Sequence, residues 1–346
     1  MDALIFSCGT GGGHNSAANA IKQELLRRGH RVTMLDPYSL SNTRVGSLIN
    51  QSYINLVKKA PRLFGLVYQL GNLYRRLPVH SPVYHINHRM ALPVQRFLEE
   101  GNFDLIIMPH IFPGEILTNM RDHGICLPPT LLIATDYTCI PFTEEVQCDR
   151  YVIPSDDLCP AFTRWGIPKE RLYPLGIPVD QSFENPPDKQ ESLRRLGLDP
   201  SLRYLLVVGK DKDQPRYQAL AKSLNCEARV RFFGMQSETL PFYQMADGLL
   251  LPTLYDPFPN VILEAMACGL PVITTTGCGG AEFIVDGHNG YVCDALDIPA
   301  LQQAVMALPA RALGSAEGGH ARERIMACTS ERLSTQLLSL YQDLVK

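Results

Sequence analysis

The stretch ALIFSCGTGGGHNSAANAI, residues 3–21, decides how the first half of this chain folds. It opens on a largely apolar run typical of a buried strand, and a glycine-rich loop and an amphipathic helix follow. Glycines let the backbone approach an anion closely, and a helix N-terminus presents free N–H groups to it. A strand, a glycine loop and a helix in this order therefore predict an α/β unit that binds phosphate.

Two familiar phosphate loops fit this stretch only in part. A P-loop requires a lysine and a Ser or Thr after the last glycine, whereas a histidine follows Gly13. The dinucleotide fingerprint G-x-G-x-x-G is matched by Gly9 and Gly11, but His14 occupies the position of the third glycine. Asp36, at the end of the next expected strand, suits a ribose contact, so a dehydrogenase remains a minority alternative.

His14 is expected at the first turn of the helix that follows the loop. The positive end of the helix dipole disfavours a cation there, so the imidazole should stay neutral and able to accept a proton. This property suits a general base acting on an acceptor hydroxyl. The alternative is that His14 only caps the helix, although Asn15 or Ser16 could cap it equally well.

Short apolar runs and amphipathic stretches alternate along the rest of the chain, which indicates parallel α/β layers. Residues 176–187, rich in proline, are the expected hinge between two Rossmann-like domains facing across a cleft. We expect domains at 1–178 and 179–330 and a terminal helix at 331–346 that packs back on the first domain. The predicted strands are residues 3–7, 31–35, 103–108, 130–134, 151–153 and 172–173, then 204–208, 230–233, 248–251 and 271–275, with later helices starting near Gln214, Thr239, Asn260 and Ala281.

Composition excludes several classes of protein. The 346 residues are 45% hydrophobic, enough for two packed domains, and 32 basic against 35 acidic residues give a net charge of -3. Disordered, collagenous and coiled-coil chains are excluded, and the apolar runs fall far short of the ~20 residues that span a bilayer. We expect no signal peptide, and the 10 cysteines, without a C-x-x-C pair, indicate reduced thiols in a cytoplasm.

No Asp or Glu occurs between Asp36 and Glu99, where basic and aromatic residues are interleaved. Such a surface is typical of a peripheral membrane face, on which each nearby Lys or Arg adds about 1 kcal/mol of attraction to anionic lipid. Nucleic acid is disfavoured as the partner of this surface because the sequence contains no recognisable nucleic-acid-binding module. The alternative is that the aromatic side chains pack in the core and that the charged side chains form an ordinary solvated face. The candidate membrane-face residues are Lys58, Lys59, Arg62, Phe64, Arg75 and Arg76.

The stretch LYDPFPNVILEAMACGLPVI, residues 254–273, is the most specific in the second half. Asp256 lies in a loop that leaves a strand, Pro259 and Asn260 open a helix, and Glu264 lies just over a turn inside it. The free N–H groups of Asn260 and Val261 can meet phosphate or sugar oxygens, and the carboxylates can accept hydrogen bonds from ring hydroxyls. A sugar nucleotide supplies all of these groups together.

From about Leu205 onward, these residues resemble the donor-binding domain of retaining GT-B glycosyltransferases, including those of the lipopolysaccharide core. The E-x7-E motif of that group appears here as Asp256-x7-Glu264. The resemblance implies that Glu264 binds the nucleotide ribose, that Asp256 and Asn260 hold the sugar and diphosphate, and that Gly234 lies near the base.

The first half, to about Gly209, resembles a different GT-B group, the monogalactosyldiacylglycerol synthases and processive diacylglycerol glucosyltransferases. The segments that carry this resemblance are residues 7–18, 108–110, 135–138 and 176–178. The resemblance implies that His14 is the catalytic base, with Asp136 as a second catalytic residue, and that the domain docks on membranes to reach diacylglycerol. The glycine turn of Gly11, Gly12 and Gly13 would contact the donor diphosphate.

The two resemblances conflict, because the first group inverts the anomeric centre and the second retains it. Residues 207–212 carry neither the glycine-rich loop of the first group nor the basic strand–helix unit of the second. We therefore expect the C-terminal domain to lack one βα unit, as in a natural or engineered chimera. Lys210 and Lys212 are weak candidates for a diphosphate clamp, the alternative being solvated lysines.

These observations predict a hexosyltransferase that moves glucose or galactose from a UDP-sugar to a diacylglycerol-like lipid, with no metal or other cofactor required. We expect it in the cytoplasm, peripheral on the inner face of the cell membrane. The alternatives are a catalytically weak or inactive sugar-nucleotide-binding scaffold and a sugar-nucleotide epimerase, which would need no basic, aromatic face.

Overall fold

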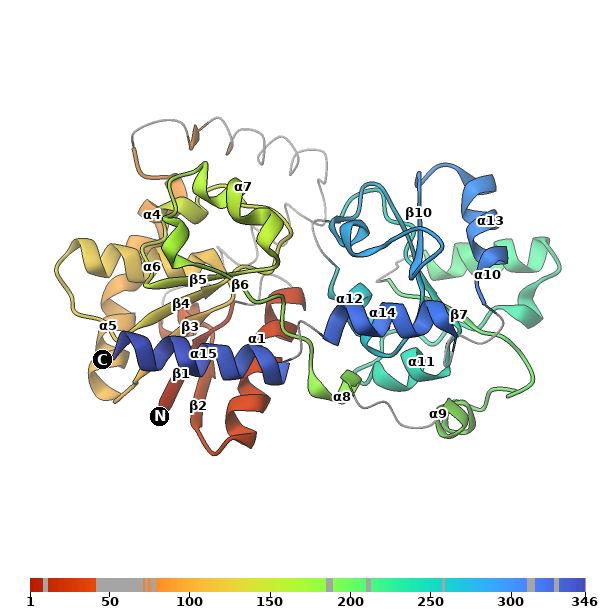
Figure 1. Ribbon diagram of the computed structural model, residues 1–346, viewed down its shortest axis with the longest axis horizontal. Coiled ribbons are helices and arrows are strands. Elements are labelled where there is room, and N and C mark those ends of the chain that lie inside the picture. Colours follow the sequence, from red (N-terminus) through yellow and green to blue (C-terminus); the bar gives the residue numbers. More distant parts are fainter. Residues whose placement is uncertain are drawn as a thin grey trace. The chain divides into compact units, whose positions relative to one another are not determined.

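The computed structural model describes residues 1–8, 12–41, 71, 74–75, 79–184, 189–209, 213–256, 259–309, 315–326 and 330–345 (Figure 1). The chain divides into two compact units. Unit 1 comprises residues 1–184, 256–260 and 325–346, and unit 2 comprises residues 185–255 and 261–324. Unit 1 therefore contains both ends of the sequence.

Unit 1 is built on a six-stranded sheet with the order β2-β1-β3-β4-β5-β6, and all of its ladders are parallel. Every residue of β3 and β4 is buried, as expected for a parallel sheet covered on both faces. The strands are β1 (Asp2–Phe6), β2 (Arg31–Leu35), β3 (Leu105–Met108), β4 (Thr130–Ile133), β5 (Arg150–Ile153) and β6 (Leu172–Pro174).

The helices of unit 1 include one from the C-terminal end of the chain, α15, which lies beside α1 (Figure 1). Leu333 and Leu337 of α15 are buried in the same core as Ile21 and Leu25 of α1. Arg28 fixes this pairing, because its guanidinium donates to the Glu331 carbonyl at 2.8 Å. The helices are α1 (Gly12–Arg27), α4 (Pro82–Asn87), α5 (Ala91–Glu100), α6 (Ile111–Asp122), α7 (Cys159–Thr163), α8 (Gln181–Glu184) and α15 (Ser330–Leu344).

Unit 2 is built on a four-stranded parallel sheet with the order β10-β9-β8-β7. Its core joins Ile273 of the sheet to Leu301, Ala304 and Leu308. The strands are β7 (Leu205–Val207), β8 (Gly248–Leu250), β9 (Val272–Thr275) and β10 (Gly290–Cys293), and the helices are α9 (Lys189–Arg195), α10 (Gln214–Ser223), α11 (Leu240–Met245), α12 (Asn260–Ala267), α13 (Ile298–Ala307) and α14 (Ala316–Met326).

Two predicted elements of unit 2 are wrong. Residues 230–233 form no strand, and Val230 and Phe232 are 38% and 39% exposed. A strand persists only when its backbone groups pair with a neighbour, and within the described residues β7 pairs with β8 alone. The helix expected near Ala281 is a short 3-10 turn, Gly279–Phe283.

Among the residues that the structure describes, no helix combines the length and apolar character needed to cross a bilayer. The other predicted strands occur within about two residues of their expected ends, whereas α6, α13 and β10 were not predicted.

Candidate active site

The candidate active site of unit 1 lies where three parallel strands end. His14 follows β1 on the first turn of α1, His110 follows β3, and Thr135 and Asp136 follow β4. Because β1, β3 and β4 are neighbours in one parallel sheet, their carboxyl ends share an edge and the following side chains gather there. The sequence separates these residues by up to 122 positions, and the sheet order alone brings them together.

The imidazole of His14 is enclosed by groups from the two neighbouring strand ends. Its Nδ1 lies 2.5 Å from Oγ1 of Thr135. The ring of His110 meets it edge-on, with centroids 4.5 Å apart. Burial lowers the pKa of His14, while the charge of Asp136 and the nearby Pro109 carbonyl raise it. The net shift is downward, so the imidazole is neutral at pH 7, as the helix position predicted.

The ring of His110 forms one side of this site and is held in place by a hydrogen bond. Its Nδ1 accepts a hydrogen bond from the Phe112 amide at 3.1 Å, which caps the N-terminus of α6. Burial, and next the charge of His14, hold the pKa of His110 well below its usual value. Since Nδ1 is an acceptor in a neutral ring, the proton is on Nε2. His110 belongs to the segment 108–110 that carries the family resemblance, but it was assigned no role in the site from the sequence.

Asp136 supplies the negative charge of the site. Burial raises its pKa and the charge of His14 lowers it, with a net upward shift. A buried carboxylate next to a neutral imidazole can stabilise the cation that forms when the imidazole takes a proton. The pair is therefore suited to general-base chemistry.

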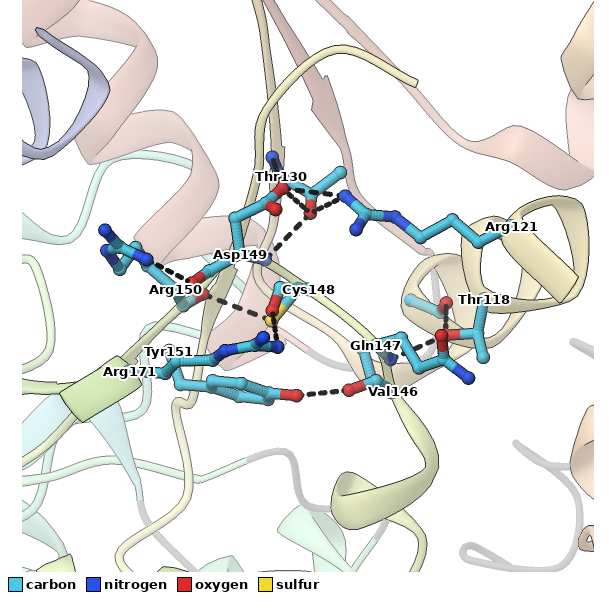
Figure 2. Close-up of polar contacts among 11 residues, drawn as sticks. Thr118, Arg121, Thr130, Val146, Gln147, Cys148, Asp149, Arg150, Tyr151 and Arg171 are labelled. Carbon is cyan, nitrogen blue, oxygen red and sulfur yellow. Dashed lines mark hydrogen bonds and ion pairs between the residues drawn. The ribbon is translucent and has the colours of Figure 1, made fainter. Parts of the chain in front are cut away.

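A polar network fixes the other end of the strand that carries Thr135 and Asp136. Oδ2 of Asp149 accepts hydrogen bonds from the amide of Thr130, at the start of β4, at 2.8 Å and from Arg121 Nη2 at 2.7 Å (Figure 2). Burial opposes ionisation of Asp149, but the hydrogen bonds from Arg121 and Thr130 outweigh it and lower the pKa. This network ties α6, β4 and β5 together.

The glycine turn is held against the end of β1. Gly12 and Gly13 begin α1, and Oγ of Ser7 donates to Oδ1 of Asn15 at 2.5 Å. This contact joins the residue after β1 to the first turn of the helix, beside His14. Gly11 lies outside the described residues.

In unit 2, Glu264 lies on the second turn of α12, the helix that begins at Asn260 and includes Val261. Oε2 of Glu264 accepts a hydrogen bond from the Tyr243 hydroxyl of α11 at 2.8 Å. Burial, and then the Glu264 charge, raise the pKa of Tyr243, so it remains a donor. The sequence indicated that Glu264 needs a partner, but spacing alone does not identify a tyrosine on another helix.

The remaining predicted donor residues lie near the ends of unit 2 strands or in loops. Asp256 follows β8 in the chain, and Pro259 is buried directly before α12. A Cβ on Gly277 would lie 2.3 Å from the Leu254 carbonyl, so only glycine lets the loop after β9 approach the chain that leaves β8. Gly234 has a φ of +67° with no atom within 4 Å of its Cβ position, so its role near a base stays a prediction.

One predicted membrane-face residue is corrected. Arg75 is only 1% exposed, its guanidinium pairs with Glu144 at 2.5 Å, and it stacks over Trp165 at 3.7 Å from the ring centroid. It is therefore a buried structural cation that lipid cannot reach. The candidates Lys58, Lys59, Arg62, Phe64, Arg76, Lys210 and Lys212 lie outside the described residues.

Two family models divide the chain between them. The model for monogalactosyldiacylglycerol (MGDG) synthase matches residues 14–179, and the model for glycosyl transferases group 1 matches residues 193–310. A solved glycosyltransferase from Rickettsia africae matches the fold with a TM-score of 0.69 at 13% identity, over 100% of this chain and 98% of that one. The two parts of the chain thus match two glycosyltransferase family models, and the chain as a whole has the GT-B fold. The two family matches change over between residues 179 and 193, and the chimera remains a hypothesis.

Curated relatives of this GT-B chain are similar to it over part of their length. N-acetyl-alpha-D-glucosaminyl L-malate synthase of Bacillus anthracis is 35% identical over 41% of this chain and 38% of its own. Lipopolysaccharide glucosyltransferase WaaG of Escherichia coli is 39% identical over 33% of this chain and 29% of its own. A probable chloroplastic monogalactosyldiacylglycerol synthase of Glycine max is 27% identical over 64% of this chain and 42% of its own. The chain thus spans less than half the length of each relative.

A structure of Anabaena HepE in complex with UDP also shares the GT-B fold, with a TM-score of 0.60 at 16% identity over 99% of this chain and 100% of that one. At this identity the likeness concerns the fold.

Proposed function

We propose that this GT-B chain transfers a hexose from a UDP-sugar to a hydroxyl of a diacylglycerol-like lipid at a membrane surface. The observation that carries the proposal is the half-buried, neutral His14 at the N-terminus of α1, held by Thr135 and accompanied by the Asp136 carboxylate. A glycosyltransferase needs a base at the acceptor and a site for the departing diphosphate, and this turn offers both.

The proposed reaction forms one bond and breaks one. The acceptor oxygen bonds to the anomeric carbon, and the bond from that carbon to the diphosphate oxygen breaks with its electron pair going to the diphosphate. His14 takes the acceptor proton, and Asp136 stabilises the imidazolium. N–H groups at the start of α1 and α12, at Gly13 and Asn260, stabilise the charge that develops on the leaving group.

The donor proposal is supported by the relatives and by α12. WaaG is described as a glucosyltransferase, and the HepE structure contains UDP. The proposed roles are ribose binding for Glu264, and sugar and diphosphate binding for Asp256 and Asn260. Glu264 is held by Tyr243, which fixes the direction of a carboxylate that would receive the ribose hydroxyls.

The lipid proposal is supported by exposed side chains on α4, on α5 and in the segment just before α4. Val79, Ile86 and Leu92 are 55%, 48% and 55% exposed. Arg89 and Arg96 are exposed on the same two-helix segment. Apolar side chains among cations suit insertion at the surface of an anionic bilayer, which supports the proposal that the protein is peripheral on the inner face of the cell membrane.

The proposal is tested by incubating the protein with radiolabelled UDP-glucose or UDP-galactose and diacylglycerol in anionic vesicles. We expect labelled glycolipid, and we expect His14→Ala to reduce the rate at least about a hundredfold because the base is lost. His30→Ala, just beyond the other end of α1, is the matched control and should retain the wild-type rate. Product that forms equally well with His14→Ala would exclude this mechanism, and absence of product with every common donor would exclude the function.

A second candidate function is donor binding without turnover. It is favoured by the four-stranded sheet of unit 2 and by residues 230–233, which form no strand there. Titration calorimetry separates the two candidates, because UDP-sugar binding without glycolipid product would favour this one.

A further inference from the structure

Two consecutive residues, Thr135 and Asp136, act on His14 in different ways. Oγ1 of Thr135 is 2.5 Å from Nδ1 of His14, and Thr135 is 5% exposed. Asp136 makes no hydrogen bond with the imidazole in the part of the chain that the structure describes, and it acts on His14 through its charge. The ring is therefore oriented by the Thr135 hydroxyl and by the Pro109 carbonyl, which also hydrogen-bonds to it, and not by the Asp136 carboxylate.

A hydroxyl on Nδ1 has a property that a carboxylate lacks. It donates to a nitrogen that carries a lone pair and accepts from a nitrogen that carries a proton, whereas an ionised carboxylate only accepts. The contact can therefore persist in the neutral and the charged ring. The contact can therefore keep the ring in one orientation whichever of its nitrogens gains and loses the proton.

Among the described residues, no other group around the His14 ring offers a hydrogen-bond partner that can both donate and accept. From the β3 side, His110 presents a ring that is fixed by the Phe112 amide, and the Pro109 carbonyl can only accept. From the β4 side, Asp136 contributes charge. Among these neighbours of His14, Thr135 alone both donates and accepts at Nδ1.

We propose that Thr135 is a positioning residue whose hydroxyl, hydrogen-bonded to Nδ1, holds the His14 ring in one orientation through proton gain and loss, while Asp136 acts on the ring through its charge. The catalytic consequence rests on the proposed function, but the hydrogen bond at Nδ1 does not.

The first test uses nitrogen-15 NMR of the histidines in the full chain, with His14→Ala identifying the His14 signals. We expect the nitrogen-15 shift of Nδ1 in wild-type His14 to report a hydrogen-bonded nitrogen. In Thr135→Val this shift should move because the hydrogen bond is lost, whereas Thr135→Ser should keep the wild-type value. Asp136→Asn should leave the hydrogen bond at Nδ1 in place and move the midpoint of the His14 titration to lower pH, because the carboxylate charge that raises the pKa is gone.

The second test uses glycolipid formation. Thr135→Val should lower kcat about tenfold to a hundredfold with little change in the donor KM, the size expected for a hydrogen bond to a charged group. Thr135→Ser should restore most of kcat. Thr138→Val, at an exposed position of the same loop, is the matched control, and thermal melting of each variant reports folding.

The outcomes separate the two proposals. If the wild-type protein forms no glycolipid but Thr135→Val moves the His14 Nδ1 shift, the proposed function fails and the positioning role stands. If Thr135→Val folds and leaves the nitrogen-15 shifts unchanged, or if Asp136→Asn moves the Nδ1 shift as Thr135→Val does, the positioning role is overturned.

Discussion

Glu115 is a buried acid outside the candidate active site. It is 0% exposed on α6, and its two carboxyl oxygens have no hydrogen-bond partner among the described residues. Burial, and next the negative charge of Glu145, raise its pKa from 4.5 to about 9. The folded protein therefore keeps this carboxyl protonated at neutral pH, where the unfolded chain has released the proton.

This pKa shift predicts how stability depends on pH. Because the folded state binds the extra proton between about pH 4.5 and 9, Glu115 makes folding less favourable as pH rises through this window. Glu115→Gln removes the effect, so the stability of the variant relative to wild type should rise by up to about 1.4 kcal/mol per pH unit. Urea unfolding at several pH values measures this difference. The exposed Glu100→Gln is the control, and parallel stability curves for Glu115→Gln and wild type would contradict the prediction.

Tyr243 gives a second prediction at this scale. Tyr243→Phe removes the hydroxyl that donates to Glu264 but keeps the buried ring, so Glu264 loses its fixed direction. We expect the donor KM to rise severalfold to about tenfold with little change in kcat, as the loss of one hydrogen bond to a carboxylate implies. Steady-state kinetics with the UDP-sugar measures this.

Tyr204→Phe, which loses a hydroxyl contact to the Asp199 carbonyl in the same unit, is the matched control for Tyr243→Phe. An equal change of KM in both variants would show that Glu264 is not involved.

The sequence predicted a residue of the candidate site only where a recognisable turn next to a helix or strand end marks its position. His14 and Glu264 were found because a glycine turn and a Pro-Asn turn precede their helices. Thr135 and Tyr243 were not assigned roles, because their contacts join residues that are 121 and 21 positions apart. Contacts of this kind depend on sheet order and helix packing, which local patterns do not encode.

At the scale of elements, apolar runs located nearly all of the strands in unit 1 because a buried parallel strand is apolar on both faces. The same signal failed at residues 230–233, because a strand also needs a paired neighbour. α6 was not predicted, since every residue from Ile111 to Met120 except Phe112 is buried, and this hides the amphipathic pattern.

The helix α15 should contribute strongly to the stability of unit 1. Leu337 is 1% exposed in the core shared with α1 and the sheet. Leu337→Ala should reduce the free energy of unfolding by about 2–5 kcal/mol, the usual cost of a buried leucine truncated to alanine. The exposed Ser339→Ala on the same helix is the control. Chemical denaturation measures both variants, and equal midpoints would show that α15 is not part of this core.

At the scale of the whole molecule, β7 is an unprotected sheet edge. Within the described residues only β8 pairs with it, and Leu205 and Val207 are 37% and 60% exposed. An exposed edge strand with apolar side chains is a template for pairing with another chain. We therefore expect self-association that increases with protein concentration.

A charge on this edge should suppress the association. Val207→Lys is expected to shift the sedimentation profile toward monomer, because lysine on an edge strand opposes pairing. Leu296→Lys adds the same charge at a residue of unit 2 that is 77% exposed, and it should leave the profile unchanged. A wild-type protein that stays monomeric at every concentration would contradict the prediction.

The return of α15 to unit 1 has a consequence for biosynthesis. The strands that pack with Leu333 and Leu337 include β1, which is translated long before α15. On the ribosome, the nascent strands of unit 1 must therefore wait with an uncovered apolar face until α15 has been translated. A polypeptide that stops before residue 330 would keep that face open to chaperones and proteases, so quality control in the cell can recognise chains that lack this one helix.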